Sequence, residues 1–82
     1  MFAYYQRAKA HLTGHDYDRA ISDFNTAIEL EPNVAGGYSN RGTAYANSKD
    51  RGRALVDFRK ALALDPNDTH ARDGLKRLGL SY

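Results

Sequence analysis

Hydrophobic side chains recur at steps of three and four residues in two stretches of the chain. The first stretch carries Tyr17, Ala20, Ile21, Phe24, Ala27 and Ile28, and the second carries Leu55, Phe58, Ala61 and Leu62. This spacing places them on one face of an α-helix. Asp16 and Asp50 are suited to cap the first turns of these helices, and Pro32 and Pro66 prevent their continuation. Each stretch is therefore predicted to be an amphipathic helix.

The residues before each of these stretches show the same helical spacing. The stripes are Tyr4, Ala8 and His11 in one case, and Tyr38, Gly42 and Tyr45 in the other. Short polar segments suited to tight turns connect each stripe to the helix that follows. After Asn67, a further amphipathic stretch carries Ala71, Leu75 and Leu78. The pattern predicts an all-α fold with helices at residues 2–13, 17–30, 35–47, 51–64 and 69–78.

The chain also repeats itself. Residues 1–34 and residues 35–68, compared without a gap, are identical at twelve positions. Each unit is thus one helical hairpin, and the helix at residues 69–79 would cover the apolar face that the second hairpin otherwise leaves in water. We expect a single domain, residues 1–82, that consists of two repeats and a capping helix.

These repeats resemble a known family. Where the tetratricopeptide repeat has Trp-x-x-Leu-Gly-x-x-Tyr, the chain has Tyr4-x-x-Arg7-Ala8-x-x-His11 and Tyr38-x-x-Arg41-Gly42-x-x-Tyr45. The family's downstream pattern is matched in full by Ala20, Phe24, Ala27 and Pro32 and by Ala54, Phe58, Ala61 and Pro66. The resemblance implies a right-handed superhelical array of antiparallel helical hairpins, or solenoid, that acts as a protein–protein interaction module or scaffold.

Arg7 and Arg41 depart from this pattern, because the family has leucine there. Asp23 and Asp57 recur at the same period, so each arginine is predicted to pair with an aspartate across its own hairpin. A partly buried guanidinium needs such a partner. In the alternative interpretation the two arginines contact a ligand, and they would then have to leave the packed stripe.

The resemblance also implies a site. In proteins similar to this one, the first helix of every hairpin lines a concave groove that holds a peptide or helix. Carried onto this sequence, the groove positions are Phe2, Tyr5, Lys9, Leu12, Thr13, Ser39, Asn40, Thr43, Asn47, His70, Asp73 and Arg77. Phe2 and Tyr5 could instead contact a preceding repeat or a neighbouring subunit. Only Asn40 matches the family's carboxylate clamp, which disfavours a chaperone-tail adaptor.

Charge adds a second functional hypothesis. The net charge is +2, with −2 in residues 1–34, +2 in residues 35–68 and +2 in residues 69–82. Lys49, Arg51, Arg53, Arg59 and Lys60 gather on the second hairpin and form either an ordinary solvated face or a site for an acidic partner. The alternative to a peptide-binding module is thus a self-assembling one, a homodimer or head-to-tail stack with no separate ligand.

Other chemistry finds little support. The chain has no cysteine, and its serines lack the motifs of nucleophilic catalysis, so we expect neither an enzyme nor a cofactor. His11, His15 and Asp16 could be read as metal ligands, but His11 aligns with Tyr45 and is better explained as a packing residue. Two and a half repeats with a mixed groove disfavour nucleic acid. The absence of a signal peptide and of a membrane-spanning run favours a cytoplasmic protein.

Overall fold

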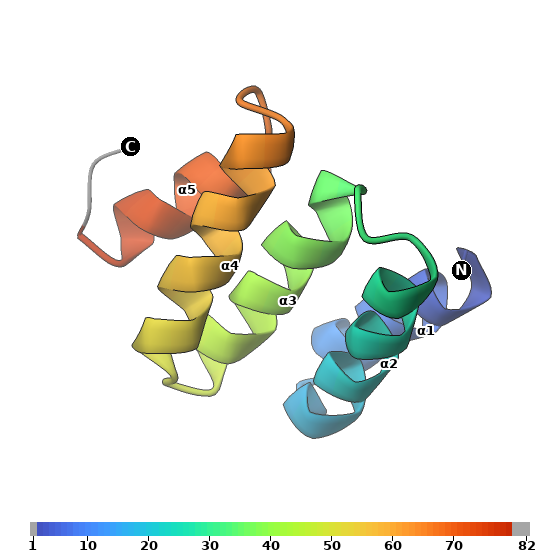
Figure 1. Ribbon diagram of the computed structural model, residues 1–82. Coiled ribbons are helices and arrows are strands. Elements are labelled where there is room, and N and C mark those ends of the chain that lie inside the picture. Colours follow the sequence, from blue (N-terminus) through green and yellow to red (C-terminus); the bar gives the residue numbers. More distant parts are fainter. Residues whose placement is uncertain (1, 80–82) are drawn as a thin grey trace.

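All regular structure in the described part of the chain is helical. The computed structural model describes residues 2–79, except for the side chain of Phe2. The helices are α1 (Phe2–Thr13), α2 (Tyr17–Leu30), α3 (Ala35–Asn47), α4 (Arg51–Leu64) and α5 (Thr69–Arg77) (Figure 1). The predicted all-α hairpin array is thereby confirmed. The helix bounds agree with the predicted ones except that α5 ends at Arg77, one residue early.

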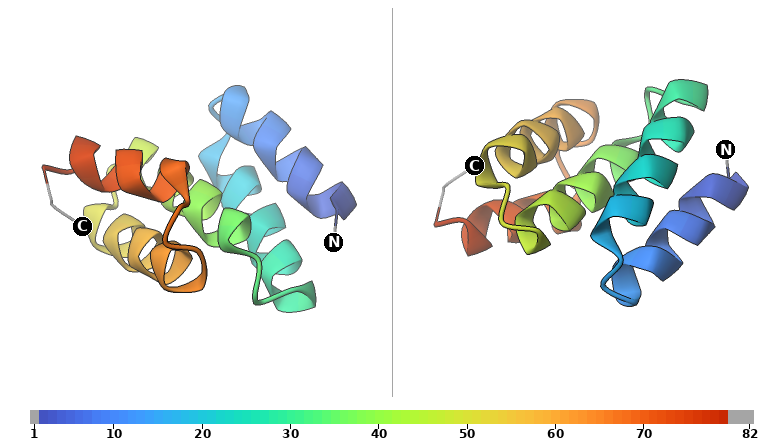
Figure 2. Two further views of the ribbon diagram at one scale, coloured as in Figure 1. Left: turned by 90° about the horizontal axis from the view of Figure 1, so that it is seen from above. Right: turned by 90° about the horizontal axis from the view of Figure 1, so that it is seen from below.

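The helices form two layers (Figures 1 and 2). We call α1, α3 and α5, the first helices of the successive repeats, the inner layer, and α2 and α4 the outer layer. In the inner layer α3 contacts both α1 and α5, whereas in the outer layer no Cα atom of α2 lies within 8 Å of one in α4. Since the inner helices touch and the outer ones stand apart, the array curves toward its inner layer.

Aspartate side chains begin three of the helices. Asp16 Oδ1 accepts a hydrogen bond from the backbone N–H of Arg19 at 3.3 Å, and Asp50 and Asp68 do the same for Arg53 and Ala71 at 3.2 and 3.0 Å. These bonds satisfy donors that the first helical turn leaves free. The predicted caps of α2 and α4 are confirmed, and α5 has an equivalent one.

The turn inside each hairpin reverses the chain through a left-handed residue. His15 has φ of 64° and Lys49 has φ of 70°, at equivalent positions of the two repeats. The next N–H reaches back to the preceding helix, from Asp16 to His11 O at 2.9 Å and from Asp50 to Tyr45 O at 2.8 Å. Glycine usually occupies such positions, so the sequence alone did not reveal this geometry.

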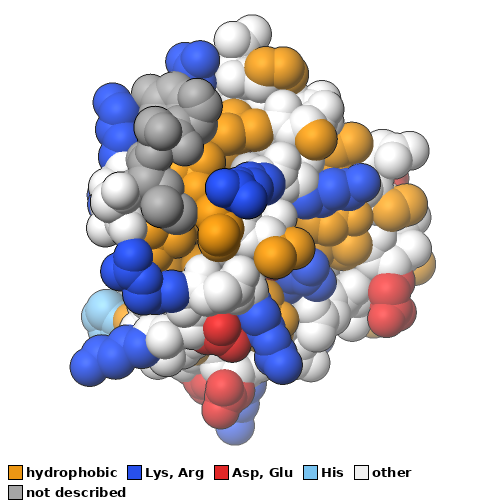
Figure 3. Space-filling view, turned by 60° about the vertical axis from the view of Figure 1, so that its left-hand side comes forward, with side chains coloured by type: hydrophobic (Ala, Val, Ile, Leu, Met, Phe, Trp, Pro, Cys, Tyr) orange, Lys and Arg blue, Asp and Glu red, His pale blue; other side chains and the backbone are white. Residues whose placement is uncertain are grey.

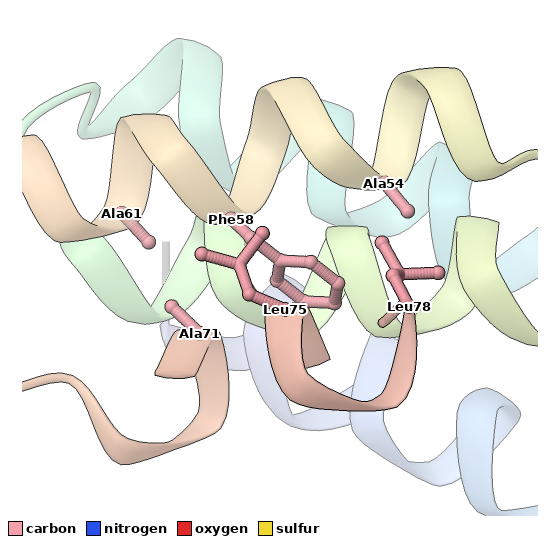
Figure 4. Packing of buried hydrophobic residues seen from close by; sticks show 6 residues of the cluster. All are labelled: Ala54, Phe58, Ala61, Ala71, Leu75 and Leu78. Atoms are coloured by element: carbon pink, nitrogen blue, oxygen red, sulfur yellow. The ribbon is translucent and has the colours of Figure 1, made fainter. Parts of the chain in front are cut away.

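The larger hydrophobic core joins α3, α4 and α5 around Phe58. The ring of Phe58 is buried with Ala54, Ala61, Ala71, Leu75 and Leu78 (Figure 4). A Cβ atom added to Gly42 of α3 would lie 2.8 Å from Phe58 Cε1, and one added to Gly74 of α5 would overlap the ring. The ring therefore fills the space between two backbones that only glycine lets come so close.

The smaller core holds the first hairpin together. Ala8, Ala20 and Phe24 are fully buried there, with Tyr5 and Leu12 packed against them. The Tyr5 and Phe24 rings meet edge to face, with centroids 5.9 Å apart. The predicted stripe of α1 is partly wrong, because Tyr4 is exposed and Tyr5 and Leu12 face the core. A helix that contacts both its own hairpin and the next repeat buries more than one stripe.

Candidate functional site

The predicted groove residues belong to the inner layer, and those at equivalent positions of successive repeats lie in rows across its helices. Positions 34 residues apart occupy the same place on successive helices, so Lys9 of α1, Thr43 of α3 and Arg77 of α5 form one row. Lys9 and Arg77 are exposed, and Thr43 is half-buried. The row thus presents a cation, a hydroxyl and a second cation along the inner surface.

Other predicted groove residues are also open to solvent. Thr13 and Asn47, at equivalent positions, are exposed at the ends of α1 and α3, and His70 and Asp73 are exposed on α5. Thr13 Oγ1 donates to Lys9 O at 3.0 Å. Together with Lys9 and Arg77, these are the predicted groove residues that are exposed. The predicted role of the Phe2 side chain lies outside the described residues.

Tyr5 connects the two repeats instead of standing free. Its hydroxyl accepts a hydrogen bond from Asn40 Nδ2 at 2.7 Å, and a Cβ added to Gly36 would lie 2.8 Å from the same oxygen. Burial, and to a smaller extent the negative charge of Asp68, raises the pKa of the Tyr5 hydroxyl. Tyr5 is half-buried, and the ammonium group of the exposed Lys9 lies 5.6 Å from its ring centroid.

Two predicted groove residues need correction. Ser39 is fully buried, and its hydroxyl donates to Gly36 O at 3.3 Å. Asn40 is 7% exposed, and its amide donates both to the Tyr5 hydroxyl and to Gly36 O, the latter at 2.8 Å. Because α3 is packed between the first hairpin and α5, these polar side chains serve the fold. Leu12 is likewise half-buried against the first core.

Comparison of the chain with models of protein families tests the resemblance that the sequence motifs indicate. Residues 2–34 and residues 35–68 each match the tetratricopeptide repeat. The chain belongs to the tetratricopeptide repeat family. None of the curated proteins matches it significantly. The repeats of this family are non-catalytic and generally mediate protein–protein interaction or scaffolding.

The two arginines that depart from the tetratricopeptide repeat pattern lie against aspartates of the same hairpin. Arg7 Nε and Nη2 donate to Asp23 at 2.7 Å each. Arg41 Nε and Nη2 donate to Asp57 at 2.8 Å each, and its Nη1 donates to Asn25 Oδ1 of the first repeat at 2.8 Å. The Arg41 side chain is 20% exposed and that of Arg7 60%. Arg41 therefore joins the two tetratricopeptide repeats as well as the two helices of its own hairpin.

These pairs change the electrostatics of the tetratricopeptide repeat core. Hydrogen bonding from the Arg7 guanidinium lowers the pKa of Asp23 below its ordinary value, and hydrogen bonding to Asp57 raises the pKa of Arg41. The Arg41 guanidinium carbon also lies 5.7 Å from the ring centroid of Tyr38 and 5.9 Å from that of Tyr45. Cation–π contacts of this kind stabilise the positive charge of the partly buried Arg41 guanidinium.

A hollow that the sequence did not predict lies on the outer side of the second tetratricopeptide repeat. Its volume is about 410 Å³, and its mostly apolar lining includes Arg41, Tyr45, Arg53, Val56 and Asp57. The equivalent residues of the first repeat, among them His11 and Ser22, line a smaller hollow of about 250 Å³. The only signal in the sequence was an apolar residue, Val56, on the polar face of its helix.

Two of the three histidines of this tetratricopeptide repeat chain lie close to a polar side chain. His11 Nε2 lies 3.7 Å from Asp23 Oδ2, and His15 Nδ1 lies 2.9 Å from the Tyr17 hydroxyl. Among residues 2–79, no three His, Asp or Glu side chains are grouped so that they could hold a metal ion. Over the same residues, no helix has the length and apolar character needed to cross a bilayer.

Proposed function

We propose that this chain is a protein-interaction module that binds a peptide or helix of a partner protein on its inner layer. The observation that carries the proposal is the Lys9–Thr43–Arg77 row, which repeats one position on three adjacent helices and is exposed at its two cations. A peptide laid across the row would meet a cation at each end and a hydroxyl between them. Carboxylate groups spaced along the peptide suit such a row best.

The neighbouring side chains add contacts that are less dependent on charge. Thr13 and Asn47 offer polar groups along one side of the row, and the half-buried Tyr5 ring offers an apolar contact beside Lys9. Aromatic surface next to amide and hydroxyl groups is typical of peptide recognition. The preferred ligand is therefore a short acidic peptide with at least one apolar side chain.

A peptide library and a pair of charge-reversed variants test this proposal. Peptides selected from a random library on the wild-type protein should bind at least tenfold more weakly to the Lys9→Glu/Arg77→Glu variant. The matched control is Arg19→Glu/Lys49→Glu, which reverses the same number of exposed charges away from the inner layer. Isothermal titration of the selected peptides gives both affinities. Equal binding by the wild type and the inner-layer variant would contradict the proposal.

A further inference from the structure

Two hydrophobic side chains of the outer layer are exposed to solvent. Leu30 at the end of α2 is 55% exposed, and Val56 in the middle of α4 is 65% exposed. The first repeat has Ser22 at the position of Val56, so the hairpin itself does not require an apolar side chain there. A β-branched residue also lowers helix propensity. The exposed valine therefore favours neither the helix nor the core.

Val56 stands at the outer hollow, whose mostly apolar lining also carries two arginines, Arg41 and Arg53, and two aspartates, Asp50 and Asp57. Arg53 is 72% exposed, its guanidinium carbon lies 5.8 Å from the ring centroid of Tyr45, and its Nε lies 3.5 Å from Asp50 Oδ2. Arg53 and Arg59 are three residues before and after Val56, so both flank it on the helix surface. With the exposed Arg53 and Arg59 on either side of Val56, this part of the α4 surface suits an apolar side chain that is accompanied by negative charge.

The chain itself carries such a group. Leu30 is flanked by Glu29 and Glu31, and all three residues are exposed at the end of α2. The charges of the two repeats are complementary too, because residues 1–34 carry a net −2 and residues 35–68 a net +2. Figure 3 shows Lys and Arg side chains spread between hydrophobic ones over the end of the molecule that α4 and α5 form.

We propose that Leu30 of one copy inserts into the outer hollow beside Val56 of a second copy. Glu29 and Glu31 then pair with the guanidinium groups of Arg53 and Arg59. The hollow, at about 410 Å³, is large enough for a leucine side chain. In a two-fold dimer the contact forms twice, whereas in a head-to-tail arrangement it forms once at each junction. The Lys9–Thr43–Arg77 row is not part of this hollow and stays free in either arrangement.

The contact is small, which determines how the association should behave. One apolar side chain with a few charge pairs belongs to the weak class of interfaces. Association should therefore increase with protein concentration, and salt should weaken it because the charges on the rim are exposed. Sedimentation velocity can follow both dependences directly.

The first measurement compares the mass in solution with the mass of one chain, 9.2 kDa. At about 10 mM salt the average mass should rise above that value as the concentration increases toward about 1 mM, and at about 1 M salt it should return to it. A single chain at every concentration and salt would overturn the proposal. In that case the hollow would be left to a foreign partner.

Complementary variants then test which residues meet. Leu30→Gln removes the inserted side chain and Val56→Gln blocks the hollow, while neither changes the charge. Each variant alone should remain a single chain. An equimolar mixture should associate, because the Leu30→Gln variant keeps the hollow beside Val56 and the Val56→Gln variant keeps the leucine that enters it. Circular dichroism should show unchanged helicity, since both residues are exposed.

The equivalent position of the first repeat supplies the matched control. Ser22→Gln should associate like the wild type, because Ser22 lines only the smaller hollow. Undiminished association of Leu30→Gln or of Val56→Gln on its own would overturn the proposal. A mixture of these two variants that stays at the mass of one chain would overturn it too. Peptide binding at the inner layer should be the same in all three variants, so this proposal can fail independently of the proposed function.

Discussion

At the scale of single residues, the two repeats place the same ion pair in different surroundings. Asp57 faces an arginine whose side chain is 20% exposed and which also reaches Asn25, whereas Asp23 faces Arg7, which is 60% exposed. If its aspartate is removed, the guanidinium of Arg7 can therefore be solvated by water, whereas that of Arg41 is largely shielded from it. An unpaired charge costs most where water is excluded.

Removing the two aspartates in turn should reveal this difference. Asp57→Ala is expected to lower the free energy of unfolding by roughly 3 kcal/mol, at the low end for a broken buried pair because Arg41 keeps some contact with water. Asp23→Ala, the matched change in the first repeat, should cost clearly less. Urea denaturation followed by circular dichroism gives both values. Equal losses would mean that exposure of the arginine does not determine the strength of the pair.

Asp23 should also make stability depend on pH in the acid range. Its folded-state pKa is lowered from an ordinary value of 3.8 by the hydrogen bond from Arg7. The ionised form therefore stabilises the fold fully above the ordinary pKa, and that contribution disappears as the pH falls through the lower folded-state pKa. The difference in stability between wild type and Asp23→Asn should shrink as the pH falls from about 5 toward 2. A difference independent of pH would exclude this origin.

At the scale of helices, close approach at Phe58 determines how α5 is seated. The ring occupies the space over Gly74, so any larger residue there has to push α5 away from α4. A second contact fixes the far end of the helix, where Arg51 Nη2 donates to Leu78 O at 2.6 Å. The capping helix is thus held by packing in its middle and by a charged hydrogen bond at its end.

The same substitution at two glycines should have opposite effects. Gly74→Ala is expected to destabilise the protein by about 1–3 kcal/mol, since the new methyl group overlaps the Phe58 ring. Gly52→Ala is the control, because this exposed helical position has nothing closer than Asp50 Oδ1 at 4.0 Å. It should stabilise α4 by about 0.5–1 kcal/mol. Thermal unfolding of both variants gives the comparison, and a stabilising Gly74→Ala would contradict the packing described.

Sequence periodicity predicted the helices well, and aspartate caps and prolines mark the ends of α2 and α4. The faces of the helices were harder to predict, since α1 and α3 contact neighbours on more than one side. Ser39 and Asn40 are polar and nevertheless buried, because Gly36 O and the Tyr5 hydroxyl satisfy them. A hydrophobic pattern cannot identify such residues. The outer hollow was missed for a related reason, because it depends on how the side chains of α3 and α4 pack against each other.

At the scale of the whole molecule, the first hairpin is held less firmly than the second. Among the described residues, its core has three buried members, Phe24 included, whereas the core around Phe58 has six, Phe58 included. In repeat arrays, stability is close to a sum of units and their nearest-neighbour contacts. The side of α1 that carries Ala3, Gln6, Arg7 and Ala10 is exposed, while the equivalent positions of α3 are mostly buried.

Hydrogen exchange should therefore differ along the chain. Amides of α1 are expected to exchange first and those of α3 and α4 last, because α1 is packed on its own hairpin and touches α3 only marginally. Exchange measured by mass spectrometry on peptides from each helix tests the order. Equal protection of α1 and α4 would show that the two hairpins open as one unit.

The Phe58 ring between Gly42 and Gly74 has a consequence for how this chain can change over time. Three helices meet at that ring, so no one of the three positions can accept a new residue by itself. An alanine at position 74 becomes acceptable only beside a smaller side chain at position 58, and the same holds for position 42. We expect the three positions to covary among related sequences, so that the second hairpin and its capping helix evolve together.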